Sequence, residues 1–202
     1  RRGSIFIFMF FFLFALGVPS SSFSTESFAT WNDGFFHSFS VADGLSQSSG
    51  QDILQDSLGR LWIGTQDGLN RFTGAGFRVY RKEEGNPRSL SHNVVMELFE
   101  DSRKELWVGT FLGGLNRYDP ESDSFERFTS TSPEHPLRSD MVRDLAENSA
   151  GEILVATDKG LDLLDPKEKK VRSIPSTDGL SIERLLVDAS GTVWMGCGAG
   201  LA

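Results

Sequence analysis

Residues 55–72 read Gln-Asp-Ser-Leu-Gly-Arg-Leu-Trp-Ile-Gly-Thr-Gln-Asp-Gly-Leu-Asn-Arg-Phe, and this stretch recurs further along the chain. Residues 100–118 and 147–164 align with all of it, and residues 187–201 align with its first part. The position of Trp62 recurs at intervals of 45, 47 and 40 residues. A repeat of this length is one supersecondary unit that must stack on its neighbours, so the stretch decides the fold class.

Each repeat is expected to fold as four short strands. An apolar run precedes the Asp-Ser-x-Gly turn, Leu-Trp-Ile-Gly-Thr and Leu-Asn-Arg-Phe follow it, and a run such as Phe77–Tyr80 completes the unit. The 3.6-residue spacing of helices is absent, and the period is typical of β-propeller blades. The sequence predicts an all-β fold, a β-propeller fragment of about three and a half four-stranded blades. The expected blades are 41–84, 85–130, 131–175 and a partial one, 176–202, that ends after its second strand.

Residues recur at four positions of the repeat because a blade needs them. An aspartate opens the tight turn and can bond its own backbone, and a glycine there supplies positive φ. A tryptophan lies in mid-strand at a packing position between blades, and a small glycine two residues later allows close approach of the next blade. These repeat-building residues are Asp56, Gly59, Trp62, Gly64, Asp101, Trp107, Gly109, Gly151, Asp188, Gly191, Trp194 and Gly196.

Two repeats depart from this pattern. Lys104 stands where the other turns have glycine, so we expect the second turn to be looser. The third repeat has Leu154 for tryptophan, Ala156 for glycine and Asp162-Leu163 for Asn-Arg. We interpret the changes in the third repeat as drift at packing positions.

Two of the recurring residue types have an alternative, chemical interpretation. The aspartates could bind calcium or serve as catalytic carboxylates, but the position recurs in the blades whereas an enzyme needs one site. The tryptophans could stack on sugar rings, but a mid-strand position favours the core. The segment that begins at Asp119 has alternating oxygen ligands, but it lacks the glycine at the sixth position and the glutamate at the twelfth that an EF-hand calcium loop needs.

Charge and composition exclude several classes of protein. The chain has 20 Lys+Arg against 28 Asp+Glu, a formal net charge of −8, which disfavours nucleic-acid binding because phosphate contacts need a basic face. One cysteine and three scattered histidines offer no metal-ligand set. Gly-x-Ser-x-Gly, His-Glu-x-x-His and phosphate-binding glycine loops are absent from the sequence. We predict no catalytic residue, no metal site and no cofactor.

Residues 1–24 have the features of a signal peptide. Arg1 and Arg2 precede an apolar stretch of 14 residues, and a serine-rich segment follows. The apolar stretch is shorter than the about 20 residues that a membrane-spanning helix needs, and a buried core helix is the alternative. We therefore expect a periplasmic location. Residues 25–40 are expected to form a leader, in which Phe35–Phe39 resembles a fourth strand that would close a ring.

The pattern Asp-Ser-x-Gly-x-Leu-Trp-Ile-Gly-Thr followed by Gly-Leu-Asn-Arg-Phe/Tyr resembles the two-component regulator propeller repeat over roughly residues 36–202. The resemblance implies the exported sensor region of a bacterial receptor, anchored in the inner membrane and followed by a histidine kinase or diguanylate cyclase. It also implies a receptor homodimer whose packing changes on signalling. A seven-bladed ring needs on the order of 315 residues. The chain is therefore expected to be a fragment, truncated before the membrane helix and the output domain, whose partners include the missing blades of its full-length chain.

The candidates for recognition are polar or exposed loop residues that do not recur, since recurring residues build the fold. Because strands alternate in direction, the connections between blades and the turns between second and third strands should share one end of the sheets. The weak ligand-binding candidates there are Gln47, Gln66, His92, Asn93, Phe111, Arg138 and Lys159. The expected ligand is a small molecule or an oligosaccharide. Two alternatives stay open: an exported propeller enzyme, a lyase or glycosidase, and a scaffold without a small ligand.

Overall fold

The computed structural model describes residues 38–133, 136–198 and 200–201. Contacts divide the chain into two units, Arg1–Ser38 and Phe39–Ala202, and the fold below is that of the second unit. The predicted signal peptide and most of the leader lie outside the described residues. Of the strand expected at 35–39, Ser38 and Phe39 are described, and neither belongs to a strand.

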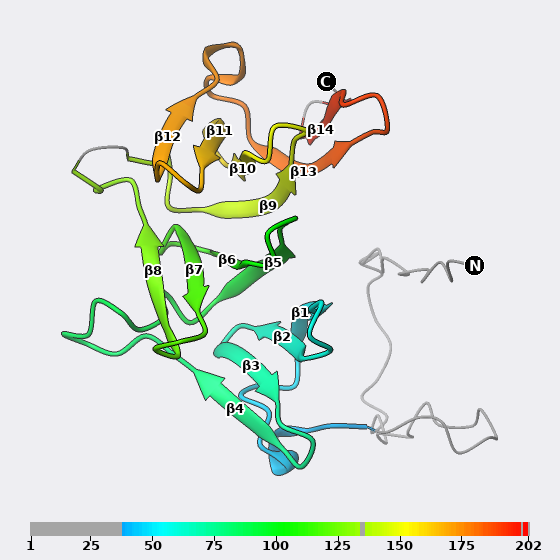
Figure 1. Cartoon of the computed structure of the whole chain (residues 1–202), viewed down its shortest axis with the longest axis vertical. Helices are drawn as coiled ribbons and strands as arrows, with labels where there is room; N and C mark the ends of the chain where they lie inside the picture. The colour runs from blue at the N-terminus through cyan, green and yellow to red at the C-terminus, as the bar shows by residue number, and fades with distance from the viewer. Residues whose placement is uncertain (1–37, 134–135, 199, 202) are drawn as a thin grey trace, which may run out of the picture. The chain divides into compact units, whose positions relative to one another are not determined.

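Three four-stranded antiparallel sheets and one three-stranded sheet make up this unit (Figure 1), which confirms the all-β prediction. The first sheet contains β1 (Gly50–Gln55), β2 (Leu61–Thr65), β3 (Gly68–Phe72) and β4 (Phe77–Tyr80). The second contains β5 (Val95–Glu100), β6 (Leu106–Thr110), β7 (Leu115–Asp119) and β8 (Ser124–Phe128). The third contains β9 (Val142–Glu147), β10 (Ile153–Thr157), β11 (Gly160–Asp165) and β12 (Lys170–Ser173).

The fourth sheet contains β13 (Ile182–Val187), β14 (Val193–Cys197) and β15 (Gly200–Leu201). The expectation that this blade ends after its second strand is wrong. The two residues of β15 pair with β14, opposite Gly196 and Cys197. The described helices are 3-10 turns, Val41–Asp43 and Pro175–Thr177.

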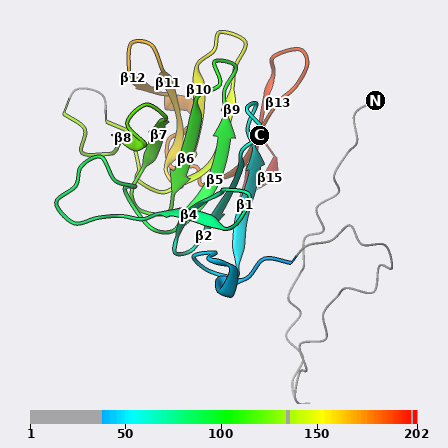
Figure 2. The same cartoon turned by 60° about the horizontal axis from the view of Figure 1, so that its bottom comes forward.

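Each of the first three sheets packs its apolar face against the next sheet along the chain. The first strands lie side by side in the order β1, β5, β9, β13 (Figures 1 and 2). Trp62 shares a buried cluster with Leu98 and Tyr118 of the second sheet, and Trp107 shares one with Leu145 of the third. Both tryptophans are fully buried, which confirms them as core residues.

Trp194 does not follow this prediction. It lies on the face of the fourth sheet that no described sheet covers, and it is 42% exposed. The physical reason is that burial of this position depends on the sheet that comes next, not on the strand that carries it.

Glycine at the second-strand position permits the close approach of the next sheet. A Cβ on Gly64 would lie 2.6 Å from Cγ1 of Val95, and a Cβ on Gly109 would lie 2.7 Å from Cγ1 of Val142. Both valines begin the first strand of the following sheet. At Gly196 the nearest atom is Cβ of Arg184 in its own sheet, at 3.6 Å. The predicted role is confirmed at the first two glycines.

The repeated aspartate is a turn residue, and it also bonds to the tryptophan of its own repeat. Oδ1 of Asp56 accepts from the backbone N–H of Leu58 and Arg60 at 3.1 and 2.8 Å. Oδ2 accepts from Nε1 of Trp62 at 2.8 Å. The tryptophans of the second and fourth sheets donate to Asp101 and Asp188 in the same way, at 3.1 and 2.9 Å.

The turn that contains Lys104 is not looser than the others, so that prediction is wrong. Lys104 adopts a φ of 70°, close to the 79° of Gly59 in the equivalent place. Its N–H donates to the carbonyl of Asp101 at 3.0 Å, and the Asp101 carboxylate accepts from the N–H of Arg103 and Glu105. The aspartate and the strand pairing therefore hold the backbone in the left-handed region despite the side chain.

Candidate functional site

The connections between sheets and the turns between second and third strands meet at one end, as expected. The N–H of Gly68 donates to the carbonyl of Asn93 at 2.8 Å, and that of Gly114 donates to Asp140 at 2.8 Å. The N–H of Gly179 donates to the carbonyl of Lys159 at 3.0 Å. We call this surface, formed by residues 44–49, 66–67, 81–94, 111–113, 129–133, 136–141, 158–159 and 174–181, the loop end.

His92 and Phe111 form an aromatic pair on the loop end. Their ring centroids are 6.5 Å apart, and Phe111 is 38% exposed. Nδ1 of His92 accepts from the N–H of Val94 at 3.1 Å, which assigns the ring proton to Nε2. Burial, followed by the charge of Lys82, lowers the pKa of His92, so the ring is neutral at pH 7. The pair thus presents an exposed aromatic ring beside a neutral imidazole.

The other candidates near this pair differ in exposure and in the hydrogen bonds that their side chains already form. Asn93 holds the connection together: its Oδ1 accepts from the N–H of Lys82 at 2.8 Å and its Nδ2 donates to Asp67 at 3.3 Å. Gln66 is exposed in the turn that precedes Gly68. Oε1 of Gln47 is buried and has no hydrogen-bond partner among the described residues.

Arg138 is a structural residue, which removes it from the ligand candidates. Its backbone N–H and its Nε donate to Asp162 at 2.7 and 3.3 Å, and its Nη1 pairs with Asp178 at 2.5 Å. The arginine side chain is 12% exposed. The side chain of Lys159 is exposed, while its carbonyl accepts from Arg138.

The change to Asp162 is therefore a compensated exchange and not drift. In the first two sheets, Asn70 and Asn116 accept from the N–H of Ser46 and Ser91 and donate to their hydroxyls. In the third sheet, arginine replaces the serine and aspartate replaces the asparagine. A comparison of both positions across the repeats would have shown that the two changes occur together.

A row of charged residues on the first strands was missed by the sequence analysis. Asp52, Glu97, Asp144 and Arg184 occupy the same register position, opposite the small second-strand residue of each sheet. Oδ2 of Asp52 accepts from the N–H of Leu98 at 2.7 Å, and Oδ2 of Asp144 accepts from Leu185 at 2.6 Å. Each thus links one sheet to the next. The signal was present, since all four residues lie four positions before the turn aspartate or asparagine.

Burial raises the pKa of Glu97 to about 8, and the charges of Asp52 and Asp144 contribute to the increase. Burial also raises the pKa of Asp144. Within the described ranges, no group of histidine, cysteine, aspartate and glutamate side chains has an arrangement that would hold a metal ion.

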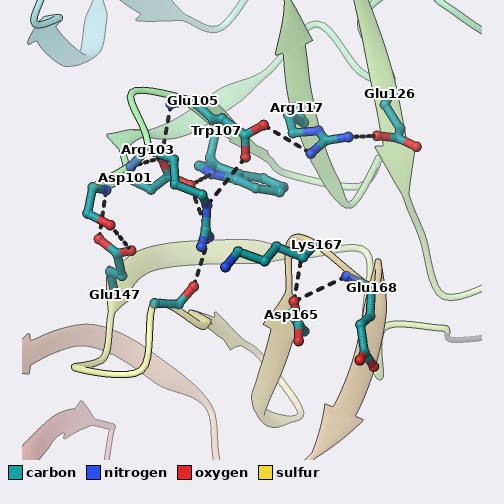
Figure 3. A network of polar contacts seen from close by, with 12 residues as sticks. Asp101, Arg103, Glu105, Trp107, Arg117, Glu126, Glu147, Asp165, Lys167 and Glu168 are labelled. Atoms are coloured by element: carbon teal, nitrogen blue, oxygen red, sulfur yellow. Dashed lines mark hydrogen bonds and ion pairs between the residues drawn. The ribbon is translucent and has the colours of Figure 1, made fainter.

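A polar network joins the second sheet to the third (Figure 3). The N–H and hydroxyl of Ser102 donate to Glu147 at 2.8 and 2.6 Å, and Nη2 of Arg103 donates to the carbonyl of Gly151 at 2.8 Å. Arg117 bridges Glu105 and Glu126 at 3.1 and 2.5 Å. Arg117 and Glu126 also line an open groove of about 840 Å³. In this groove the Arg117 and Glu126 side chains bond to each other.

No helix in the described ranges has the length and apolar character needed to cross a membrane.

Stacked four-stranded sheets with adjacent first strands define the class of protein: this is an array of β-propeller blades. Residues 44–67 and 89–111 match the model of the family named Two component regulator propeller. The match covers parts of the first and second repeats.

A relative named Histidine kinase P4, from Formosa agariphila, is 49% identical over 71 residues, which are 35% of this chain and 5% of the relative. The extracellular domain of the hybrid two component system BT3049 from B. thetaiotaomicron superposes with a TM-score of 0.66 at 24% identity. The alignment covers 85% of this chain and 23% of that one. The chain therefore spans a small part of the length of either protein.

Propellers with other roles share the fold. Virginiamycin B lyase from Staphylococcus aureus superposes with a TM-score of 0.53 at 15% identity, over 74% of this chain and 53% of the lyase. Identities of this size show the fold alone, so neither this likeness nor the likeness to the extracellular domain assigns an activity to the chain.

Proposed function

We propose that this chain belongs to the sensor propeller of an exported bacterial two-component receptor. The observation that carries the proposal is the family match at residues 44–67 and 89–111, supported by the 49% identity with a histidine kinase. In the proposed receptor the propeller lies in the periplasm, is not itself an enzyme, and is tethered through a membrane helix to a kinase or cyclase. Two receptor chains pair, and a change in their packing carries the signal.

The His92–Phe111 pair on the loop end is the proposed ligand site. An exposed aromatic ring stacks on the apolar face of a sugar or another ring, and the Nε2–H of His92 is a hydrogen-bond donor for a hydroxyl or carbonyl. Gln66 adds an exposed amide in the neighbouring turn. The proposed ligand class is therefore a neutral, ring-containing molecule with hydroxyl groups, such as an oligosaccharide.

Calorimetric titration with a panel of oligosaccharides tests this site. We expect one class to bind, and Phe111→Ala to weaken that binding at least tenfold. Leu58→Ala is the matched control, because Leu58 is also an exposed apolar residue but lies in the turn between β1 and β2. Failure of every sugar to bind would favour the scaffold alternative, and equal losses in both variants would refute a specific role for Phe111.

The open face of the fourth sheet is proposed to bind a further blade of the full-length protein. Leu186 and Leu201 are 62% and 72% exposed there, and with Trp194 they line an apolar depression of about 300 Å³. In the three described interfaces between sheets, such a face is covered by apolar residues of the next sheet. In a longer product of the gene, Trp194 should become protected from quenching by iodide; unchanged quenching would contradict the proposal.

A further inference from the structure

Two contacts between successive sheets recur from the first interface to the second. Gly64 receives Val95 in the first interface, and Gly109 receives Val142 in the same way in the second. Tryptophan occupies the same position in both interfaces. Proteins built from similar repeats are prone to wrong pairing of their units during folding. These two shared contacts do not determine which sheet follows which.

At two facing positions in the contact between successive sheets, the signs of the charges differ between the first interface and the second. The first position lies on the fourth strand: Arg78 pairs in register with Arg71, and Glu126 pairs with Arg117. The second lies in the hairpin before the fourth strand of the following sheet, where Asp123 and Lys169 both adopt a left-handed backbone, with φ of 51° and 57°. We call these two positions the rim pair.

The two rim pairs occupy equivalent positions and have opposite polarity. Arg78 of the first sheet forms an ion pair with Asp123 of the second. Glu126 of the second sheet forms one with Lys169 of the third, at 2.5 Å between Oε1 and Nζ. In the first interface the base comes from the strand, whereas in the second it comes from the hairpin.

We propose that the polarity of the rim pair selects the order of the sheets. If the third sheet of a second molecule took the place of the second sheet, Arg78 would face Lys169. If the second sheet met another second sheet, Glu126 would face Asp123. Both wrong pairings bring like charges together at a contact whose correct version is attractive. Specificity of this kind depends on the repulsive element as much as on the attractive one.

Charge reversal at Arg78 provides the test. Arg78→Glu and Arg78→Gln both remove the native ion pair with Asp123, but Arg78→Glu also creates an attraction to Lys169 of a second molecule. A third variant, Arg78→Glu with Lys169→Gln, removes that attraction again. Each full chain is refolded from urea at 50 mM and 500 mM NaCl, and the share of dimer is measured by size-exclusion chromatography with light scattering.

We expect the dimer share to be about three- to fivefold higher for Arg78→Glu than for the other two variants at low salt. The excess should shrink at 500 mM NaCl, because salt screens exposed charges. Equal shares in Arg78→Glu and Arg78→Gln, or an excess that persists without Lys169, would overturn the proposal.

Where the refolded protein aggregates, zero-length cross-linking with a carbodiimide provides a second measurement of which residues meet. The proposal predicts an intermolecular link between residue 78 and Lys169 in Arg78→Glu. Cross-links restricted to the native Glu126–Lys169 pair in that variant would refute it.

Discussion

The recurring residues act as linked pairs, and the third repeat shows this most directly. Asp56, Asp101 and Asp188 each accept a hydrogen bond from the tryptophan six residues later. The repeat that has Leu154 in place of tryptophan also has Asn148 in place of aspartate. Asn148 keeps the backbone bonds of the turn, to Ala150 and Glu152, and uses its Nδ2 on Glu152. The carboxylate is thus retained where an indole N–H needs an acceptor.

Asp101→Ala should lower the free energy of unfolding by about 3 kcal/mol, because it leaves the buried Nε1 of Trp107 and two turn N–H groups without an acceptor. Urea denaturation followed by tryptophan fluorescence measures the loss. Asp188→Ala is the control, and we expect a smaller loss because water can reach the exposed Trp194. Equal losses at both sites would contradict the importance of the buried indole bond.

Glu97 should make the protein less stable as the pH rises. Its pKa is raised from 4.5 in the unfolded chain to about 8 in the fold, so the folded state holds the proton more tightly. The stabilisation from protonation is complete below pH 4.5 and is lost as the pH increases through 8. Urea denaturation between pH 5 and 9 should therefore show a decreasing free energy of unfolding, and Glu97→Gln should flatten that decrease. A slope unchanged in the variant would refute this assignment.

At the scale of the turn, position 104 shows that an aspartate and two paired strands can impose a backbone conformation. Lys104→Gly should raise the free energy of unfolding by about 1 kcal/mol, since glycine adopts positive φ without the steric penalty of a Cβ. Thermal denaturation measures the gain. The reverse change, Gly59→Lys, meets no neighbouring atom within 4 Å of its Cβ and should cost a similar amount. A destabilised Lys104→Gly would contradict this explanation.

At the scale of two packed sheets, the glycine of the second strand sets the distance to the next sheet. Gly109→Ala would place a methyl group 2.7 Å from Cγ1 of Val142, so we expect a loss of about 1–3 kcal/mol from overpacking. Gly196→Ala has its nearest neighbour at 3.6 Å and is the matched control with little change. The urea concentration at the denaturation midpoint is compared between the Gly109→Ala and Gly196→Ala variants. A Gly109→Ala variant that is as stable as the unsubstituted protein would show that the second and third sheets can move apart without loss of stability.

For the molecule as a whole, the open face of the fourth sheet is a cluster of exposed apolar residues: Leu186, Trp194 and Leu201. Leu186→Lys should reduce concentration-dependent association, measured by sedimentation velocity, because it places a charge within that face. Leu58→Lys changes an equally exposed leucine in a turn and should leave association as it was. Association that persists in Leu186→Lys would place the contact elsewhere.

Only part of the candidate site could be predicted from the repeat pattern. His92 and Phe111 were candidates because they lie outside that pattern, and the structure brings their rings together. Arg138 was also outside the pattern, but it replaces a serine in a contact whose partner, Asp162, changed with it. A residue that differs from its equivalents in the other repeats is thus a recognition candidate only when the residue that it contacts is the same in all of those repeats.

The sequence by itself determined the strands, the tight turns and the apolar faces, because these depend on local conformational preference and on a pattern repeated every 40 to 47 residues. Tertiary structure decided which side chains meet across sheets: the Asp52–Leu98 link, the Arg138–Asp162 pair and the reversed rim pairs. It also decided that Trp62 is buried while Trp194 is exposed. The physical reason is that each of these features depends on residues 24 to 46 positions away or on the sheet that follows, which no local pattern specifies.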